Sequence, residues 1–253
     1  MKFSERLAVD LRMLGVKEGD VLLVHTSLKG LRAPGITPDD VIEALLGTIT
    51  SEGTLLIPAL SYQSVTKEHP YFSVRETPSC IGAVPERFRT RYAQYRSVHP
   101  THSVCASGKL AYALTAWHKL DETPVGEHSP FMQLPLLGGK ILMLGCGLRP
   151  NTFMHGVEEH AHAPYPLASR MQEYTITDAD GSSYSQSYFP HDFGQIEQRY
   201  DRLADMLSAP ELVGGNALGG TAWLIDAKAA LRAASARIHE EPYFFVDVPD
   251  GGK

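Results

Sequence analysis

Apolar and polar positions follow two alternating periods along this chain, which predicts helices and strands in turn. Apolar residues recur with helical spacing over 3–14 and 37–49, whereas short apolar runs at 21–24 and 54–57 are typical of buried strands. Thr37 is a suitable helix cap, and Pro38, Asp39 and Asp40 suit the first turn that follows it. The first fifth of the sequence therefore predicts an α/β fold.

The alternation continues to the carboxyl end, with one interruption. Residues 62–79 lack strong periodicity and contain Pro70 and Pro78, so we expect a long loop that borders the active site. Asp180 and Gly181 mark the turn of an alternating hairpin. The other predicted elements are helices over 84–91, 111–118, 153–161, 195–207 and 226–239, strands at 141–144 and from Ser103 onward, and the hairpin strands within 172–189.

Length and composition fit one compact enzyme, and we expect a single domain over 1–253. The 253 residues include 43% hydrophobic side chains, which is enough for a sizeable core. The net charge is −6 and no basic run is present, so nucleic acid is not expected as a partner. A cationic small molecule is favoured, and scattered carboxylates could add to a negative field at Glu122, Glu127, Glu159, Glu240 and Glu241, although ordinary surface positions also account for them.

Cysteine usage and hydropathy favour a cytoplasmic protein without membrane insertion. Cys80, Cys105 and Cys146 form no paired motif and lie among apolar residues, which is typical of buried free thiols in a reducing compartment. No apolar run approaches the ~20 residues that a membrane-spanning helix requires. The sequence does not distinguish a monomer from a homodimer.

The segment from Thr152 to Glu158 contains the strongest candidate chemistry. His155 precedes Glu158 by three residues at the start of a predicted helix, so the two side chains share one face. Glu158 could accept a hydrogen bond from one ring nitrogen of His155 and leave the other as a general base. A surface pair without function has the same spacing, so the motif needs support from the rest of the chain.

Two other polar segments give that support. The stretch from Arg96 to Gly108 is rich in hydroxyls and contains His99 before a proline, which predicts a polar loop leading into a strand. His25, Thr26 and Ser27 end an apolar strand and precede Lys29 and Gly30. Hydroxyls and backbone amides at the end of a strand suit phosphate.

Taken together, the short motifs of this chain resemble the antibiotic N-acetyltransferase family, whose best-known members use acetyl-coenzyme A to acetylate the 3-amino group of aminoglycosides. The resemblance covers nearly the whole chain and rests on the order and spacing of several motifs. They are His25-Thr26-Ser27-Leu28, Gly53-Thr54-Leu55-Leu56-Ile57-Pro58, Arg96-Ser97-x-His99-Pro100-x-x-Ser103, Gly126-x-x-Ser129-Pro130, Thr152-x-x-His155-x-x-Glu158 and His191-Asp192-Phe193.

The resemblance implies a three-layer α/β/α fold with a mixed central sheet and a smaller lobe around an active-site cleft. It also implies direct acyl transfer with His155 as the base, oriented by Glu158 or by Asp192, which we do not separate. Contacts to acetyl-coenzyme A are expected from His25, Thr26, Ser27, Leu28, Lys29, Arg96, Ser97, His102 and Ser103. Contacts to the acceptor are expected from Glu159, His191 and Tyr62.

Three other classes of function are less favoured by the residues. A metal-dependent hydrolase could use the histidines and carboxylates of 155–162 with His191 and Asp192, but their spacing does not match HExxH, and we expect no metal. Cys105 and Cys146 lie in apolar strands, so packing explains them better than nucleophilic catalysis. A binding or scaffolding protein with a decayed site would not need the complete set of His155, Glu158, His191 and Asp192.

The acceptor amine depends on the loops around the cleft. Residues 172–193 look compact and contain few carboxylates to meet the ammonium groups of an aminoglycoside. A charged contact of this kind contributes roughly 1.5–3 kcal/mol. We therefore expect a narrow range of aminoglycosides, or an amine of another kind.

Overall fold

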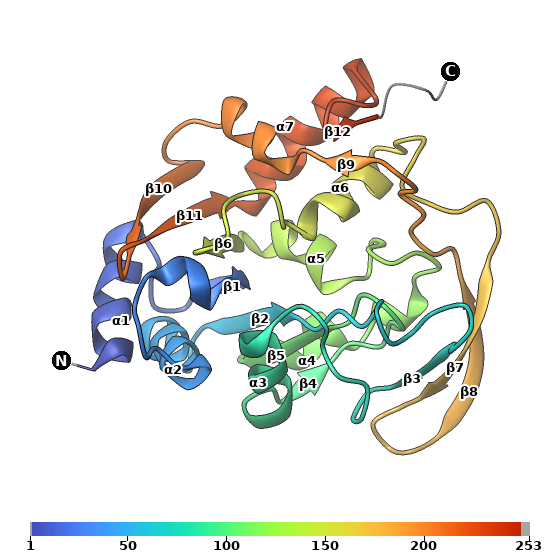
Figure 1. The fold of residues 1–253 in the computed structure, drawn as a ribbon, viewed down its shortest axis with the longest axis horizontal. Helices are drawn as coiled ribbons and strands as arrows, with labels where there is room; N and C mark the ends of the chain where they lie inside the picture. Colours follow the sequence, from blue (N-terminus) through green and yellow to red (C-terminus); the bar gives the residue numbers. More distant parts are fainter. Residues whose placement is uncertain (1, 249–253) are drawn as a thin grey trace.

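The central feature of the fold is a seven-stranded mixed sheet in the order β10-β11-β6-β1-β2-β5-β4 (Figure 1). The computed structural model describes residues 2–248. Strands β6, β1 and β2 are parallel neighbours, and β11 and β5 join them in antiparallel pairing. The strands of this sheet are β1 (Val21–Thr26), β2 (Thr54–Pro58), β4 (Tyr95–Arg96), β5 (Val104–Gly108), β6 (Lys140–Leu144), β10 (Leu212–Ala217) and β11 (Gly220–Asp226).

Helices cover both faces of the sheet, which gives the three-layer α/β/α arrangement that the sequence predicts. Along β1, Leu22 and Val24 pack with the first group of helices, whereas Val21 and Leu23 pack with the second, because successive strand residues point to opposite faces. The first group is α1 (Phe3–Leu14), α2 (Pro38–Ile49) and α3 (Ala83–Arg91); the second is α4 (Ala111–Thr115), α5 (Pro130–Gln133), α6 (Phe153–His160) and α7 (Ala227–Glu240).

A three-stranded sheet forms the smaller lobe that we expected beside the main layers (Figure 1). It consists of β3 (Tyr71–Ser73), β7 (Gln172–Thr177) and β8 (Ser183–Tyr188), and it has a separate cluster of buried side chains around Phe72, Ile176 and Tyr188. The predicted hairpin is confirmed as β7 and β8. The predicted loop over 62–79 was wrong in part, because β3 lies within it and pairs with β7.

The sequence prediction was also wrong near the carboxyl end. The expected helix over 195–207 is instead β9 (Glu197–Gln198), which pairs with β12 (Val246–Asp247), followed by the 3-10 helix η4 (Tyr200–Asp205). Arg199 and Arg202 both form ion pairs with Asp247, so tertiary contacts override the local helical pattern. The remaining 3-10 helices are η1 (Leu28–Leu31), η2 (His118–Leu120) and η3 (Leu134–Leu137).

The hairpin of β10 and β11 was not predicted, because its glycines interrupt the apolar alternation that marks a strand. Gly214 lies against the ring of Trp223 on the neighbouring strand, where a Cβ atom would come within 2.7 Å of the indole. Leu218 and Gly219 form the two-residue turn, and both have positive φ, as the tight turns that join twisted strands require.

Gly30 lies in the turn after β1, where its backbone packs closely against the loop that follows β6. A Cβ atom added at Gly30 would collide with the carbonyl oxygen of Gly145. We expect Gly30→Ala to lower the free energy of unfolding by about 1–3 kcal/mol, because backbone is displaced rather than a flexible side chain. Gly47→Ala is the matched control: Gly47 is exposed on α2 with open space around it, and alanine favours helix. Equal stability of both variants in chemical denaturation would contradict this prediction.

Candidate active site

A pocket of about 530 Å³ opens beside the carboxyl ends of β1 and β6. Loops that follow neighbouring parallel strands meet at this edge, which is a common location for binding sites in α/β proteins. The residues around the pocket come from several distant segments. They are Val24, His25, Thr26, Leu60, Tyr62, Ile81, Pro85, Thr101, His102, Cys146, Arg149, Pro150, Asn151, Thr152, His155, Pro190, His191, Phe193, Gln198 and Tyr200.

His155 lies in the first turn of α6 and lines this pocket. Its Nδ1 atom is 3.4 Å from Oε2 of Glu158, whose side chain is fully buried one turn later. The structure thus brings the two side chains together as their spacing predicts. This direct contact is long, however, and a third residue connects the pair more closely.

The hydroxyl of Tyr200 lies between His155 and Glu158. It donates a 2.8 Å hydrogen bond to Oε2 of Glu158 and is 2.7 Å from Nδ1 of His155. Burial, reinforced by the Glu158 carboxylate, raises the pKa of Tyr200 well above its usual value, so the phenol keeps its proton. The phenol has one proton and donates it to Glu158, so toward His155 the phenol oxygen can act only as an acceptor. Nδ1 of His155 therefore carries the proton of that hydrogen bond. This arrangement places the lone pair of His155 on Nε2.

Glu158 is held from its other side by Tyr165, whose hydroxyl donates a 2.8 Å hydrogen bond to Oε1. Asp192, the second carboxylate that the sequence leaves open as the partner of His155, is exposed, and its backbone N–H donates to the carbonyl of Pro166. Within residues 2–248 its side chain makes no hydrogen bond to His155. The geometry therefore favours Glu158 for orienting the imidazole.

Two further histidines lie next to His155. The ring of His191 is 4.9 Å from that of His155 and 4.7 Å from that of His102, measured between centroids. Burial lowers the pKa of His102 and of His191 well below the usual value, and it lowers the pKa of His25 to about 3. These three imidazoles are therefore neutral at neutral pH.

Of the three residues that the resemblance assigns to the acceptor, two line the pocket and one lies behind it. Tyr62 and His191 line it. Glu159 lies behind His191, where its Oε1 atom is 2.7 Å from Nε2 of that histidine and also accepts from the backbone N–H of Val125. Glu159 is thus placed to support His191 rather than to contact a ligand in the pocket.

Of the residues assigned to acetyl-coenzyme A, some line the pocket and others do not. His25, Thr26 and His102 line the pocket, and Ser27, Leu28 and exposed Lys29 follow in the next turn. Arg96, by contrast, donates to carbonyls of Ala59, Val74 and Thr77.

The hydroxyls of Ser97 and Ser103 are also used within the protein. Ser97 is fully buried and lies 2.8 Å from Nδ1 of His118. Ser103 is fully buried as well, and its hydroxyl donates to the carbonyl of Ala59. The structure therefore places Arg96, Ser97 and Ser103 behind the pocket wall, where they hold the loop that carries His102.

Tyr200 and Asn151 are among the polar residues of the pocket that sequence reasoning missed. Tyr200 gave no motif, because it is 42 positions from Glu158 in the chain and its segment was predicted as an ordinary helix. Asn151 is 1% exposed, and both atoms of its carboxamide lack a hydrogen-bond partner among the described residues. A buried amide with an unused donor and acceptor at a pocket wall is suited to bind a polar ligand.

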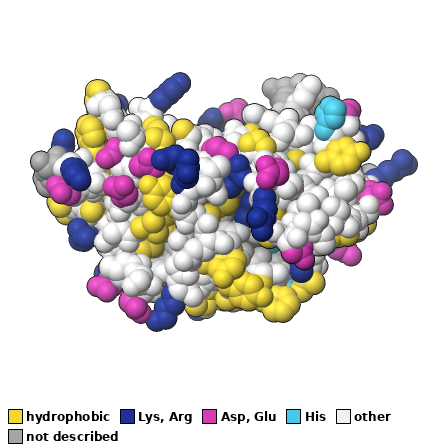
Figure 2. Space-filling model, turned by 90° about the horizontal axis from the view of Figure 1, so that it is seen from below, with side chains coloured by type: hydrophobic (Ala, Val, Ile, Leu, Met, Phe, Trp, Pro, Cys, Tyr) yellow, Lys and Arg dark blue, Asp and Glu magenta, His cyan; other side chains and the backbone are white. Residues whose placement is uncertain are grey.

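The pocket lining contains no aspartate or glutamate within the described residues, and its one permanent charge, Arg149, forms ion pairs with Glu197 and Asp201. None of the five carboxylates considered from the sequence lines it. The face shown in Figure 2 carries basic and acidic side chains in a mixed arrangement, without an extended region of one sign. Among the described residues, the pocket lining therefore offers no carboxylate to the ammonium groups of a bound polycation.

Neither cysteine considered as a nucleophile is poised to attack. Burial raises the pKa of Cys105 to about 12 and that of Cys146 to about 11, so both remain thiols at neutral pH. Cys80, Cys105 and Cys146 are all free, as predicted, although only Cys105 is fully buried. In the described part of the chain, every helix is too short or too polar to cross a bilayer.

Comparison with known proteins gives one consistent result. A family model described as aminoglycoside 3-N-acetyltransferase matches residues 23–239. Aminoglycoside N(3)-acetyltransferase VII of Streptomyces paromomycinus is 34% identical over 176 residues, and this match covers 63% of the present chain and 61% of the relative. The matched part is thus less than two thirds of that relative's length.

Solved structures resemble nearly the whole chain. AAC-IIIb in a binary complex with CoASH superimposes with a TM-score of 0.80 at 26% identity, covering 94% of this chain and 96% of that one. A mutant of AAC(3)-IVa in complex with a gentamicin superimposes with a TM-score of 0.81 at 26% identity, covering 98% and 92% of the two chains.

Proposed function

The chain belongs to the aminoglycoside 3-N-acetyltransferase family, and we propose that it transfers an acetyl group from acetyl-coenzyme A to an amine, with His155 as the general base. The observation that carries this proposal is the Glu158–Tyr200–His155 arrangement, which leaves Nε2 of a pocket histidine free to take a proton. The complex of a relative with CoASH supports coenzyme A as the carrier.

The proposed reaction is a direct transfer. The neutral amine attacks the thioester carbonyl, a C–N bond forms, and Nε2 of His155 takes the proton that the nitrogen loses. The tetrahedral intermediate then collapses, the C–S bond breaks, and the leaving thiolate recovers that proton from the imidazolium. Glu158 stabilises the positive charge on His155 between these steps through Tyr200.

The oxygen of the tetrahedral intermediate needs a hydrogen-bond donor that is already in place. We propose the Nδ2 atom of Asn151 for this role, because the carboxamide lines the pocket close in sequence to α6 and has no partner of its own among the described residues.

The first candidate acceptor is the 3-amino group of an aminoglycoside, as the names of the relatives suggest. The second is an amine with fewer positive charges, and the specific observation in its favour is the pocket lining without carboxylates. A polycation bound there would leave ammonium groups without charged partners.

Thiol release from acetyl-coenzyme A, measured with a panel of aminoglycosides and uncharged or singly charged amines, tests the function and ranks these acceptors. We expect release with few aminoglycosides and with more of the less charged amines. Comparable turnover across differently substituted aminoglycosides would contradict the narrow range, and no release with any amine would contradict the acyltransferase itself.

A further inference from the structure

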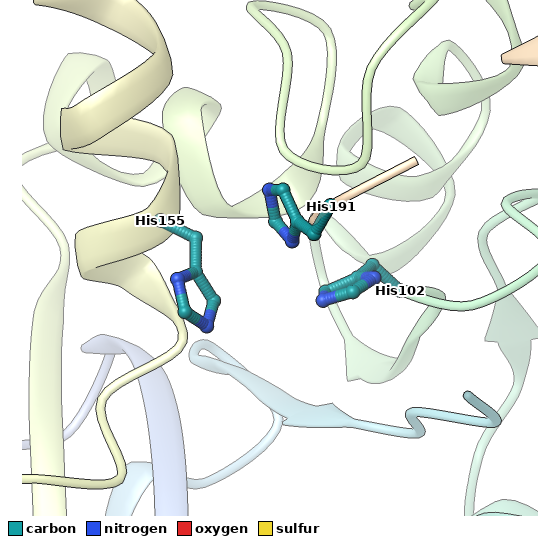
Figure 3. A group of neighbouring side chains, drawn as sticks. All are labelled: His102, His155 and His191. Atoms are coloured by element: carbon teal, nitrogen blue, oxygen red, sulfur yellow. The ribbon is translucent and has the colours of Figure 1, made fainter. Parts of the chain in front are cut away.

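Three imidazoles from separate segments converge at the wall of the pocket (Figure 3). His155 lies on α6, His102 in the loop before β5 and His191 in the loop after β8. One ring nitrogen of each lies within 4.8 Å of the corresponding nitrogens of the other two.

The second nitrogen of each ring is already engaged. Nδ1 of His102 is 2.8 Å from the hydroxyl of Thr101, Nδ1 of His155 is 2.7 Å from the hydroxyl of Tyr200, and Nε2 of His191 is 2.7 Å from Oε1 of Glu159. The nitrogens that remain are His102 Nε2, His155 Nε2 and His191 Nδ1. The last of these is buried and has no hydrogen-bond partner in the described structure.

Histidines that bind metal ions have this arrangement. The nitrogen opposite the metal donates its proton to a carboxylate, a backbone carbonyl or a water molecule, which fixes the tautomer and the direction of the ring, and a hydroxyl oxygen can accept in the same way. Here one carboxylate and two hydroxyls fill these positions. We propose that His102, His155 and His191 together bind one divalent transition-metal ion of the zinc type, with the fourth coordination position open to the pocket.

Zinc is one ion that this donor set fits, and we use it as the probe in the test. Three imidazole ligands with an open position are a known form of tetrahedral zinc site, whereas magnesium and calcium require oxygen ligands. Tetrahedral coordination at about 2.0–2.1 Å places the nitrogens about 3.3 Å apart. One ring nitrogen of each histidine now lies within 4.8 Å of the other two, so the ligand nitrogens must approach one another by up to about 1.5 Å on binding.

Metal binding and the proposed catalysis exclude each other, because both use the lone pair on Nε2 of His155. This consequence rests on the proposed function. Zinc should then inhibit thiol release, and a chelator should restore it. The binding itself does not depend on the activity and can be measured without a substrate.

The test is a titration of chelator-treated protein with Zn²⁺ by calorimetry and with Co²⁺ by visible absorption, where low-coordinate Co²⁺ gives an intense band. We expect one equivalent to bind. His102→Ala and His191→Ala should abolish the Co²⁺ band, and Glu159→Gln should weaken Zn²⁺ binding about 10–100-fold by removing the carboxylate behind His191.

His160→Ala is the matched control, because His160 is exposed at the far end of α6 and should leave both signals unchanged. The proposal is overturned if wild-type protein gives no Co²⁺ band, or if His102→Ala and His191→Ala bind Zn²⁺ like the wild type. The first criterion needs no variant, so it applies even if a substitution prevents folding. If the wild-type protein gives the Co²⁺ band but releases no thiol with any amine, the metal site is supported and only the proposed function is contradicted.

Discussion

Replacing His155 with alanine is expected to lower kcat for acetyl transfer by about 10²–10⁴-fold at neutral pH, which is the usual contribution of a general base. The variant should still bind acetyl-coenzyme A, because the proposed contacts to the carrier come from other segments. Thiol release and binding of coenzyme A, measured separately on the same preparation, check both parts of this prediction.

His160→Ala is the matched control for this prediction as well, because it removes an exposed imidazole from the same helix and does not alter the pocket. Both variants should give thermal transitions close to that of the wild type. If His155→Ala retains kcat within a factor of about ten of wild type, less than general-base catalysis contributes, another group must take the proton.

Much of the architecture follows from local sequence patterns. Helices α1, α2 and α6 and strands β1, β2 and β6 were predicted within a few residues, because their apolar periods are long or their caps are clear. The contact between His155 and Glu158 was predictable for a related reason, since three residues along a helix fix two side chains on one face.

The remaining parts of the site depend on contacts between distant segments, which no local period encodes. Tyr200 reaches Glu158 only because η4 packs beside α6, and its segment was predicted as a different element. The meeting of His102 with His191 depends on how two loops lie across the sheet edge. The expectation of no metal rested on comparison with the HExxH spacing, and such spacing gives no information on whether His102, His155 and His191, from three separate segments, meet.

The role of Glu158 gives the second large expected effect. Glu158→Gln keeps the size of the side chain but replaces one acceptor oxygen with an NH₂ donor. If that NH₂ faces Tyr200, the phenol must turn its proton toward His155, so Nδ1 becomes the acceptor and Nε2 carries the proton. A base with its lone pair on the wrong nitrogen cannot act, and we expect kcat to fall by about 10²–10⁴-fold.

Combining Glu158→Gln with His155→Ala separates this explanation from a general loss of structure. If Glu158 acts only by orienting His155, the double variant should have the same kcat as His155→Ala alone, because residues that act as one unit are not additive. A further tenfold or larger loss in the double variant would mean that Glu158 contributes by a route independent of His155. Tyr200→Phe should fall in the same non-additive group, since its hydroxyl is the only described link shorter than 3 Å between the two residues.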